Sequence, residues 1–298
     1  MTAVAPLRAP WQAVAMETPR TLDEIIDRYD AVYCDVWGVV HNGRARYPGA
    51  CEALMRARGA GKPVILVTNV PKPRDPIPGQ LDAIGVPRSA WDAIVTSGDS
   101  IRAELAARAP GPMYKIGPAH DRALWEGLGL ARSDLSAARF IGISGLNHDD
   151  HETPDDYADI LRQARARDLD LICANPDIVV RVGDRLVWCA GAIAQAYEKL
   201  GGRVIMAGKP YPPIYALAAR DLAQVAGREI ASGRILAIGD GIATDVIGAN
   251  QAGIDALFVA SGMHGEALKT QGRLDKAKVE KALAAEGATA RYVMPGLM

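Results

Sequence analysis

The chain has 298 residues, of which 49 % are apolar and 23 % are charged. That length suits about two domains of roughly 150 residues each, and the composition excludes wholesale disorder. The 34 basic and 35 acidic residues leave a formal net charge of -1. Neither a nucleic acid nor a membrane is therefore expected as a partner. No stretch of the sequence is apolar for long enough to suggest a membrane span.

The cysteine spacing and the N-terminal region point to a cytoplasmic protein. Cys34, Cys51, Cys173 and Cys189 lack C-x-x-C spacing. That spacing favours buried free thiols in a reducing compartment over a zinc ribbon or a disulfide framework. Residues 1–20 form an N-terminal extension that contains three prolines and no unbroken apolar run. The extension therefore does not resemble a signal peptide.

Short apolar runs alternate along much of the chain with segments of helical period, a pattern typical of βα units and a mainly parallel sheet. Strands are predicted at 31–34, 64–67, 93–95, 204–206, 235–238 and 256–259, and helices from Pro48, over about 213–225 and over 276–285. Residues 21–108 and 204–298 are therefore predicted to form one α/β core domain.

Residues 109–203 interrupt this core with a different pattern. Short strands are predicted at 113–116, 140–143, 169–173, 178–180 and 186–188. Thr153 and Asp156 have the spacing of a capping box, and a segment of helical period follows them. We expect a second α/β domain, inserted into the first.

Polar side chains follow the predicted core strands where each strand ends. The strand endings carry Asp35, Thr68 with Asn69, Thr96 with Ser97, Lys209, and Gly239 with Asp240. Ligands of open parallel sheets bind in the crevice outside the carboxyl ends of the strands. These endings are therefore predicted to surround one crevice.

Three of the acids near this crevice predict a magnesium site. Asp35, Asp240 and Asp245 would repel one another unless a cation neutralised them. An all-oxygen carboxylate site with open positions suits Mg²⁺. Lys209 and Thr68 would supply a positive charge and a hydroxyl donor for phosphoryl oxygens. Such parts suit phosphoryl transfer through an aspartyl-phosphate.

Four segments, taken in chain order, resemble the four motifs of the haloacid dehalogenase (HAD) superfamily. They are Asp35-Val-Trp-Gly-Val-Val, Val67-Thr-Asn, Gly208-Lys-Pro and Gly239-Asp-Gly-Ile-Ala-Thr-Asp. Asn175-Pro-Asp and Gly191-Ala-Ile resemble the cap signature of the NagD-like class IIA branch. The resemblance implies a HAD-like Rossmannoid core of α/β class with an inserted class IIA cap domain over 109–203.

The resemblance also implies a function and a role for each motif residue. It implies a Mg²⁺-dependent phosphatase for a small phosphorylated metabolite, with the cap selecting the substrate, and class IIA relatives suggest a homodimer by analogy. The implied catalytic residues are Asp35, Thr68 and Lys209. The implied metal ligands are Asp35, the backbone carbonyl of Trp37, Asp240 and Asp245. The implied substrate-binding residues are Asn69, Asn175, Pro176 and Asp177.

One position departs from the family pattern. HAD phosphatases usually carry a second Asp two residues after the nucleophile, where this chain has Trp37. That Asp acts as general acid and base, a contribution of about 10²–10⁴-fold. His41 is an alternative proton donor. The substitution leaves two alternatives open: a slow phosphotransferase, and a catalytically impaired protein that binds or senses a phosphometabolite.

Overall fold

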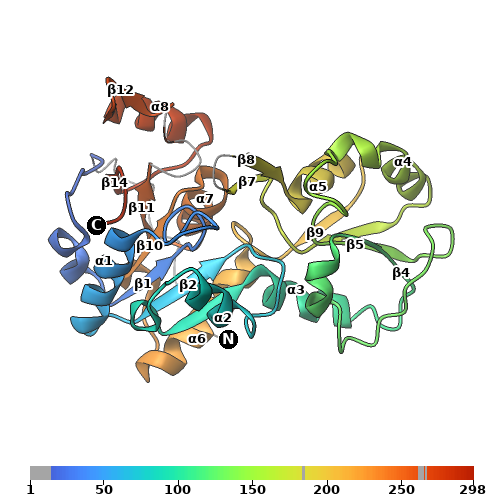
Figure 1. Ribbon diagram of the computed structural model, residues 1–298, viewed down its shortest axis with the longest axis horizontal. Helices are drawn as coiled ribbons and strands as arrows, with labels where there is room; N and C mark the ends of the chain where they lie inside the picture. Colours follow the sequence, from blue (N-terminus) through green and yellow to red (C-terminus); the bar gives the residue numbers. More distant parts are fainter. Residues whose placement is uncertain (1–14, 183–184, 261–264, 266) are drawn as a thin grey trace, which may run out of the picture.

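The core domain is built on one parallel sheet in the computed structural model, which describes residues 15–182, 185–260, 265 and 267–298. Within these residues the sheet has the strand order β14-β11-β10-β1-β2-β3 (Figure 1). The strands are β1 (Ala31–Cys34), β2 (Val64–Thr68), β3 (Ala93–Thr96), β10 (Ile235–Gly239), β11 (Asp255–Val259) and β14 (Tyr292–Met294). The sheet continues from β10 through β11 to β14 on one side, and from β1 through β2 to β3 on the other. The boundary between β10 and β1 is therefore the topological switch point, where ligands of open α/β sheets bind.

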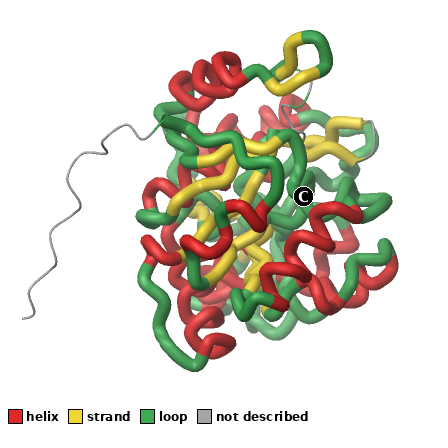
Figure 2. The backbone as a smooth tube through the Cα atoms, turned by 90° about the vertical axis from the view of Figure 1, so that its left-hand side faces the viewer, coloured by secondary structure: helices red, strands yellow, loops and turns green. Residues whose placement is uncertain are grey.

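Helices cover both faces of this sheet, as Figure 2 shows from the side of the core. Along β1, Val32 and Cys34 join one buried cluster while Ala31 and Tyr33 join the other, because successive side chains of a strand alternate. The first face packs against α1 (Pro48–Gly59), α2 (Ile77–Ala83) and the short 3₁₀ turns η1 (Leu22–Glu24), η2 (Ile26–Arg28) and η3 (Arg88–Ala90). The second packs against α6 (Pro212–Ala226), α7 (Ile247–Gln251) and α8 (Lys276–Ala285).

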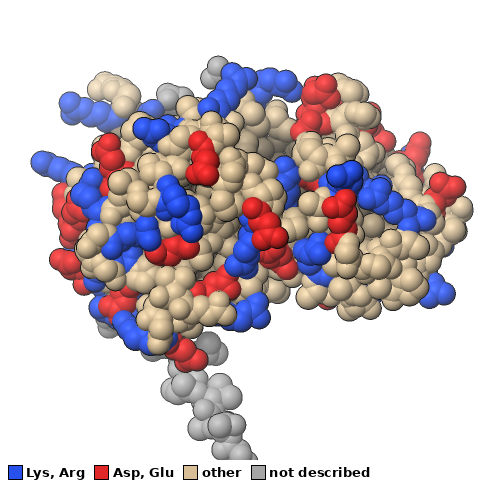
Figure 3. All heavy atoms as spheres, turned by 60° about the horizontal axis from the view of Figure 1, so that its bottom comes forward, with Lys and Arg blue, Asp and Glu red and all other residues tan. Residues whose placement is uncertain are grey.

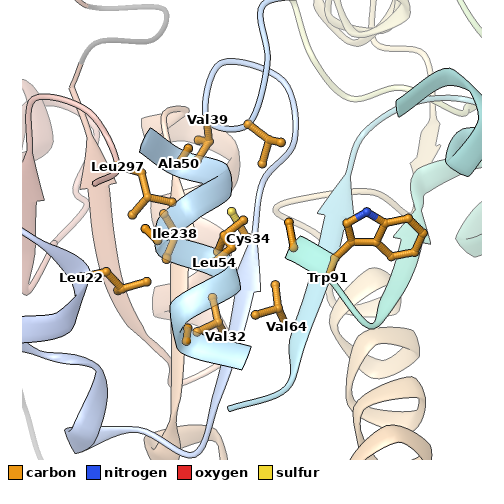
Figure 4. Packing of buried hydrophobic residues seen from close by; sticks show 14 of the residues in the cluster. Leu22, Val32, Cys34, Val39, Ala50, Leu54, Val64, Trp91, Ile238 and Leu297 are labelled. Carbon is orange, nitrogen blue, oxygen red and sulfur yellow. The ribbon is translucent and has the colours of Figure 1, made fainter. Parts of the chain in front are cut away.

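Packing around α1 anchors the loop that carries the first motif. Ala50 and Leu54 of this helix point toward Val32 and Ile238 of the sheet (Figure 4). A buried leucine of this kind contributes about 1.5–3 kcal/mol relative to an exposed one. The helix begins at Pro48, as predicted from the sequence. The loop between β1 and α1 is thereby held at both ends.

The inserted cap is a second α/β unit. Its parallel sheet has the order β4-β5-β6-β9. The strands are β4 (Met113–Ile116), β5 (Phe140–Ile143), β6 (Asp170–Cys173) and β9 (Val204–Met206). One face packs against α4 (Ala158–Ala166) and α5 (Ala190–Lys199), and the other against α3 (Ser97–Ala106) and the 3₁₀ turn η4 (Ala119–Leu124). The predicted capping box is present at Thr153, before η5 (Pro154–Tyr157) and α4.

An antiparallel hairpin, β7 (Val179–Val182) and β8 (Arg185–Trp188), projects from the cap. Figure 1 shows it at the junction of the two domains, beside the region of α7. A smaller pair, β12 (Lys269–Thr270) and β13 (Arg273–Leu274), precedes α8. The remaining short elements are η6 (Ser232–Arg234) and a π-helical turn, η7 (Ile242–Val246).

One strand belongs to a different domain from the one predicted. The sequence pattern places 204–206 in the core, and this is wrong, because β9 pairs with β6 at the edge of the cap sheet. Lys209 therefore enters the core from the last cap strand rather than from a core strand. A short apolar run fits the edge of either parallel sheet equally well, so its local pattern does not reveal which sheet it joins.

The surface and the cysteines agree with the composition. Basic and acidic side chains are interspersed on the face in Figure 3, over both domains. All four cysteines are free and buried, as expected. Among the described residues, no helix combines the length and apolarity that crossing a membrane requires.

Candidate active site

A cavity lies at the carboxyl edge of the core sheet, at the switch point between β1 and β10. Asp35 directly follows β1, Thr68 is the last residue of β2, and Asp240 directly follows β10. The cavity lining comprises Asp35, Trp37, Gly38, Asn42, Tyr47, Thr68, Asn69, Asp177, Val180, Arg181, Lys209, Asp240, Gly241, Thr244 and Asp245. The predicted catalytic residues therefore meet at one place, and the cap supplies part of the wall.

The three predicted acidic ligands converge in this cavity. Asp35, Asp240 and Asp245 are all buried, and one carboxylate oxygen of each lies within 4.8 Å of the others. Burial raises the pKa of Asp35 well above its ordinary value; Lys209 opposes the rise, and the neighbouring acids add to it. Such a group of oxygen donors fits Mg²⁺, which would offset the mutual repulsion.

Glycine at position 38 permits the close approach of the first motif to Asp240. Gly38 has a φ of +88°, and a Cβ atom there would lie 2.2 Å from Asp240 Oδ2. Both the positive φ and the lack of space exclude larger side chains without movement. The backbone beside Trp37 therefore passes directly against one of the acids, and the Trp37 carbonyl stays a predicted metal ligand.

Lys209 joins two of the acids. Its Nζ donates to Asp35 Oδ1 and to Asp245 Oδ1, each at 2.6 Å. Burial opposes the ammonium charge, but the carboxylates of Asp245 and Asp35 outweigh it and raise the pKa of Lys209 well above its ordinary value. Lys209 is therefore a fixed positive charge against the predicted nucleophile.

Asn69 holds the Lys209 segment in place. Its Oδ1 accepts from the Lys209 backbone N–H at 2.7 Å, and its Nδ2 donates to the Lys209 carbonyl at 3.0 Å. The same Nδ2 donates to Asp177 Oδ1 at 2.8 Å. Both amide protons of Asn69 are therefore engaged within the protein. The Asn69 side chain connects core, Lys209 and cap, whereas the sequence predicts a substrate ligand.

The predicted cap loop contributes Asp177 to the cavity, and its other residues shape the loop. Buried Asn175 accepts the Asp177 backbone N–H at its Oδ1, at 3.1 Å. A Cβ atom on Gly191 would lie 2.2 Å from the Pro176 carbonyl oxygen. Gly191 therefore allows α5 to begin directly against the loop. Asn175 and Pro176 do not line the cavity that contains Asp35.

Trp37 connects the core to the cap hairpin. Its Nε1 donates to the Arg181 carbonyl oxygen at 2.6 Å. A Cβ atom on Gly43 would lie 2.5 Å from the indole ring, so the 41–43 turn packs tightly beneath it. Trp37, two residues after Asp35, thus holds β7 beside the cavity.

His41 lies under Trp37 and does not line the cavity. Its ring meets the indole edge-on, with ring centroids 5.1 Å apart, and its Nδ1 accepts the Gly43 backbone N–H at 2.9 Å. Burial lowers the pKa of His41 to about 4. The imidazole is therefore neutral near pH 7. These contacts favour support of Trp37 over the proton-donor role considered for His41.

Four lining residues, namely Asn42, Tyr47, Val180 and Arg181, are absent from the motif-based prediction. Tyr47 directly precedes α1 and Arg181 lies in β7. Neither belongs to a motif. The only sequence signal for Arg181 is its position shortly after the Asn175–Asp177 loop.

Comparisons with known proteins agree with this fold. A family model described as haloacid dehalogenase-like hydrolase matches residues 32–131, and a second, described as HAD-hydrolase-like, matches residues 206–285. The crystal structure of a haloacid dehalogenase-like hydrolase from Brucella suis 1330 is 42 % identical, with a TM-score of 0.85. That match covers 94 % of this chain and 100 % of the other. The chain belongs to the haloacid dehalogenase-like hydrolases.

Further relatives place it in the NagD-like branch, class IIA. The ribonucleotide monophosphatase NagD of Escherichia coli K12 is 27 % identical over 240 residues, which cover 78 % of this chain and 88 % of NagD. The glycerol phosphate phosphatase of Mycobacterium tuberculosis, solved with calcium, is 25 % identical with a TM-score of 0.59. That match covers 80 % of this chain and 68 % of the other.

Proposed function

We propose that this chain is a Mg²⁺-dependent phosphatase that hydrolyses a small phosphorylated metabolite through an aspartyl-phosphate on Asp35. The observation that carries the proposal is the buried cluster of Asp35, Asp240 and Asp245 with Lys209 bonded to two of the three. The phosphatase names of its relatives agree with it. Bound at the three acids, Mg²⁺ would neutralise them and withdraw charge from a phosphoryl oxygen.

In this mechanism the second oxygen of Asp35 attacks phosphorus while Lys209 holds Oδ1. The phosphorus–oxygen bond to the leaving group breaks, and that oxygen departs with the electron pair. Lys209 and Thr68 stabilise the charge on the phosphoryl oxygens. Water then hydrolyses the aspartyl-phosphate, releasing phosphate and restoring the carboxylate.

The cap contributes by closing the cavity. Asp177 and Arg181 reach it from the cap, and their contacts with Asn69 and Trp37 tie cap to core. Closure of this kind excludes water and strengthens the electrostatic interactions inside. The cap is also the part of the wall that a substrate's leaving group would meet.

The presence of Trp37 favours a second candidate function that uses the same aspartyl-phosphate chemistry. An indole supplies no acid or base, so the attack of water on the aspartyl-phosphate is slowed by up to about 10²–10⁴-fold. A slow phosphotransferase that accumulates the phosphorylated Asp35 is the result. In the extreme case turnover is lost, and a phosphometabolite-binding or sensing protein remains.

Phosphate release from p-nitrophenyl phosphate and acetyl phosphate tests the proposed function. Both substrates have good leaving groups, for which a missing acid matters least. Release that requires Mg²⁺, disappears with EDTA and is abolished in Asp35→Asn is the expected result. Asp27→Asn, at an exposed residue of η2, is the matched control. Tight binding of phosphorylated ligands without release from either compound would favour the sensor instead.

We also propose a cytoplasmic location and a homodimer. The buried free cysteines are compatible with a reducing compartment. Leu186 and Trp188 on β8 are 57 % and 40 % exposed and give the cap an apolar surface. Light scattering of the purified protein tests the oligomeric state, and a monomer at all concentrations would contradict the dimer.

A further inference from the structure

Arg181 is placed above the catalytic cavity by a contact that the sequence does not predict. Three cap residues line the cavity, namely Asp177, Val180 and Arg181, and Arg181 is the cation among them. Its carbonyl oxygen accepts the Trp37 indole N–H at 2.6 Å. That hydrogen bond fixes the backbone of β7 at this residue. The Cα atom from which the Arg181 side chain extends is therefore held in place on the cap wall.

The two cations of the cavity differ in their partners. Lys209 is bonded to Asp35 and Asp245 on the floor of the cavity. Among the described carboxylates, by contrast, none forms an ion pair with the Arg181 guanidinium. Asp177, the acid that the cap contributes to the cavity lining, accepts a hydrogen bond from Asn69. Arg181 is thus available to an anion that enters the cavity.

The position of that anion follows from the reaction geometry. A phosphoryl group must lie at Asp35 and Lys209, on the core side. The rest of the substrate extends from there toward the cap, where Arg181 stands. A guanidinium binds a planar carboxylate through two parallel hydrogen bonds. A carboxylate also adds less negative charge than a second phosphate would to a cavity that already holds four acids, Asp35, Asp177, Asp240 and Asp245.

We propose that Arg181, positioned by Trp37, selects phosphate monoesters whose leaving group carries a carboxylate. The inference rests on the proposed phosphatase function and names its substrate class. Trp37 acts as a positioning residue through its indole N–H. At the position where the family pattern has an acid–base residue, this chain therefore has a residue that positions a substrate-binding arginine.

A matched substrate pair tests this inference. 3-Phosphoglycerate and glycerol 3-phosphate differ only in a carboxylate against a hydroxymethyl group. A hydrogen bond to a charged group corresponds to about 10- to 100-fold, so kcat/KM should favour 3-phosphoglycerate by about that factor. Arg181→Gln should bring the ratio close to one, chiefly through KM, and Arg181→Lys should restore part of it.

Two further variants separate selection from general damage. Arg185→Gln changes an exposed arginine of the same hairpin that does not line the cavity, and it should keep the wild-type ratio. Trp37→Phe removes the indole N–H and keeps an aromatic ring, and it should lower the ratio by raising KM for 3-phosphoglycerate.

Failure of the inference is distinguishable from failure of the proposed function. Equal kcat/KM for the two esters, or an unchanged ratio in Arg181→Gln, would overturn the inference while phosphatase activity stands. If neither of these esters nor p-nitrophenyl phosphate released phosphate, the proposed function would be refuted, and the inference with it.

Discussion

Replacing Trp37 by Asp should raise the rate of hydrolysis for esters with poor leaving groups. The variant places a carboxyl group two residues after Asp35, where the family has its acid–base residue. Like charges on Asp35 and Asp240 would raise the pKa of the new group. A raised pKa keeps the carboxyl protonated closer to pH 7, as a general acid requires.

The size of the gain follows from two opposing contributions. General acid–base catalysis contributes about 10²–10⁴-fold, or about 2.7–5.5 kcal/mol of barrier. The variant also loses the hydrogen bond from Trp37 Nε1 to the Arg181 carbonyl. A bond of this kind contributes about 0.5–1.5 kcal/mol, which can cost up to about tenfold in cap closure. We therefore expect a net gain of about 10- to 1,000-fold.

The assay compares glycerol 3-phosphate with p-nitrophenyl phosphate in Trp37→Asp and Trp37→Asn. The Asn variant has nearly the same shape and loses the same indole contact, but it has no acidic proton. Trp37→Asp should exceed Trp37→Asn by about 10²–10⁴-fold on glycerol 3-phosphate and by far less on p-nitrophenyl phosphate. Equal rates of the two variants on glycerol 3-phosphate would refute the reasoning.

Three further predictions concern stability. Lys209→Met should lower the free energy of unfolding at pH 7 by about 3–5 kcal/mol, because it leaves Asp35 and Asp245 buried without their cation; a loss below about 1 kcal/mol in urea titrations would contradict this. Mg²⁺ at 100 times its Kd should stabilise the fold by about 2.7 kcal/mol and raise Tm, and EDTA should reverse this effect. A Tm that changes with neither Mg²⁺ nor EDTA would contradict the metal site. Burial lowers the pKa of His41 from 6.5 to about 4. Between those values the unfolded chain binds a proton that the folded chain does not, so acidification from about pH 6.5 to pH 4 should remove about 3 kcal/mol of stability. His41→Gln should show a correspondingly shallower pH dependence, and the wild-type slope in that variant would be incompatible with a buried neutral imidazole.

The cluster of acids could be predicted from the sequence because it depends on local pattern and one general rule. Asp35 and Asp240 each follow a short buried strand, and parallel strands end at the same edge of a sheet. Asp245 lies at the start of the helical segment after Asp240. A local pattern also predicts α1, because Pro48 is typical of the first turn of a helix.

Other features of the site depend on contacts between distant segments. The hydrogen bond between Trp37 and Arg181 spans 144 residues, and no periodicity or spacing encodes it. The engagement of Asn69 by the Lys209 backbone spans 140 residues. Such contacts determine which side chains are free to bind the substrate and which ones hold other side chains in place. The same holds for β9, whose apolar run is compatible with either sheet.

Covalent phosphorylation of Asp35 is the central claim, and trapping it is the most direct test. The enzyme would be mixed with ³²P-labelled acetyl phosphate and Mg²⁺, quenched in acid during turnover, and mapped by mass spectrometry. We predict an acid-stable, hydroxylamine-sensitive phosphoryl group on Asp35 that is absent in Asp35→Asn and in EDTA. Phosphate release by wild type without any label on Asp35, or with label on another residue, would contradict the mechanism.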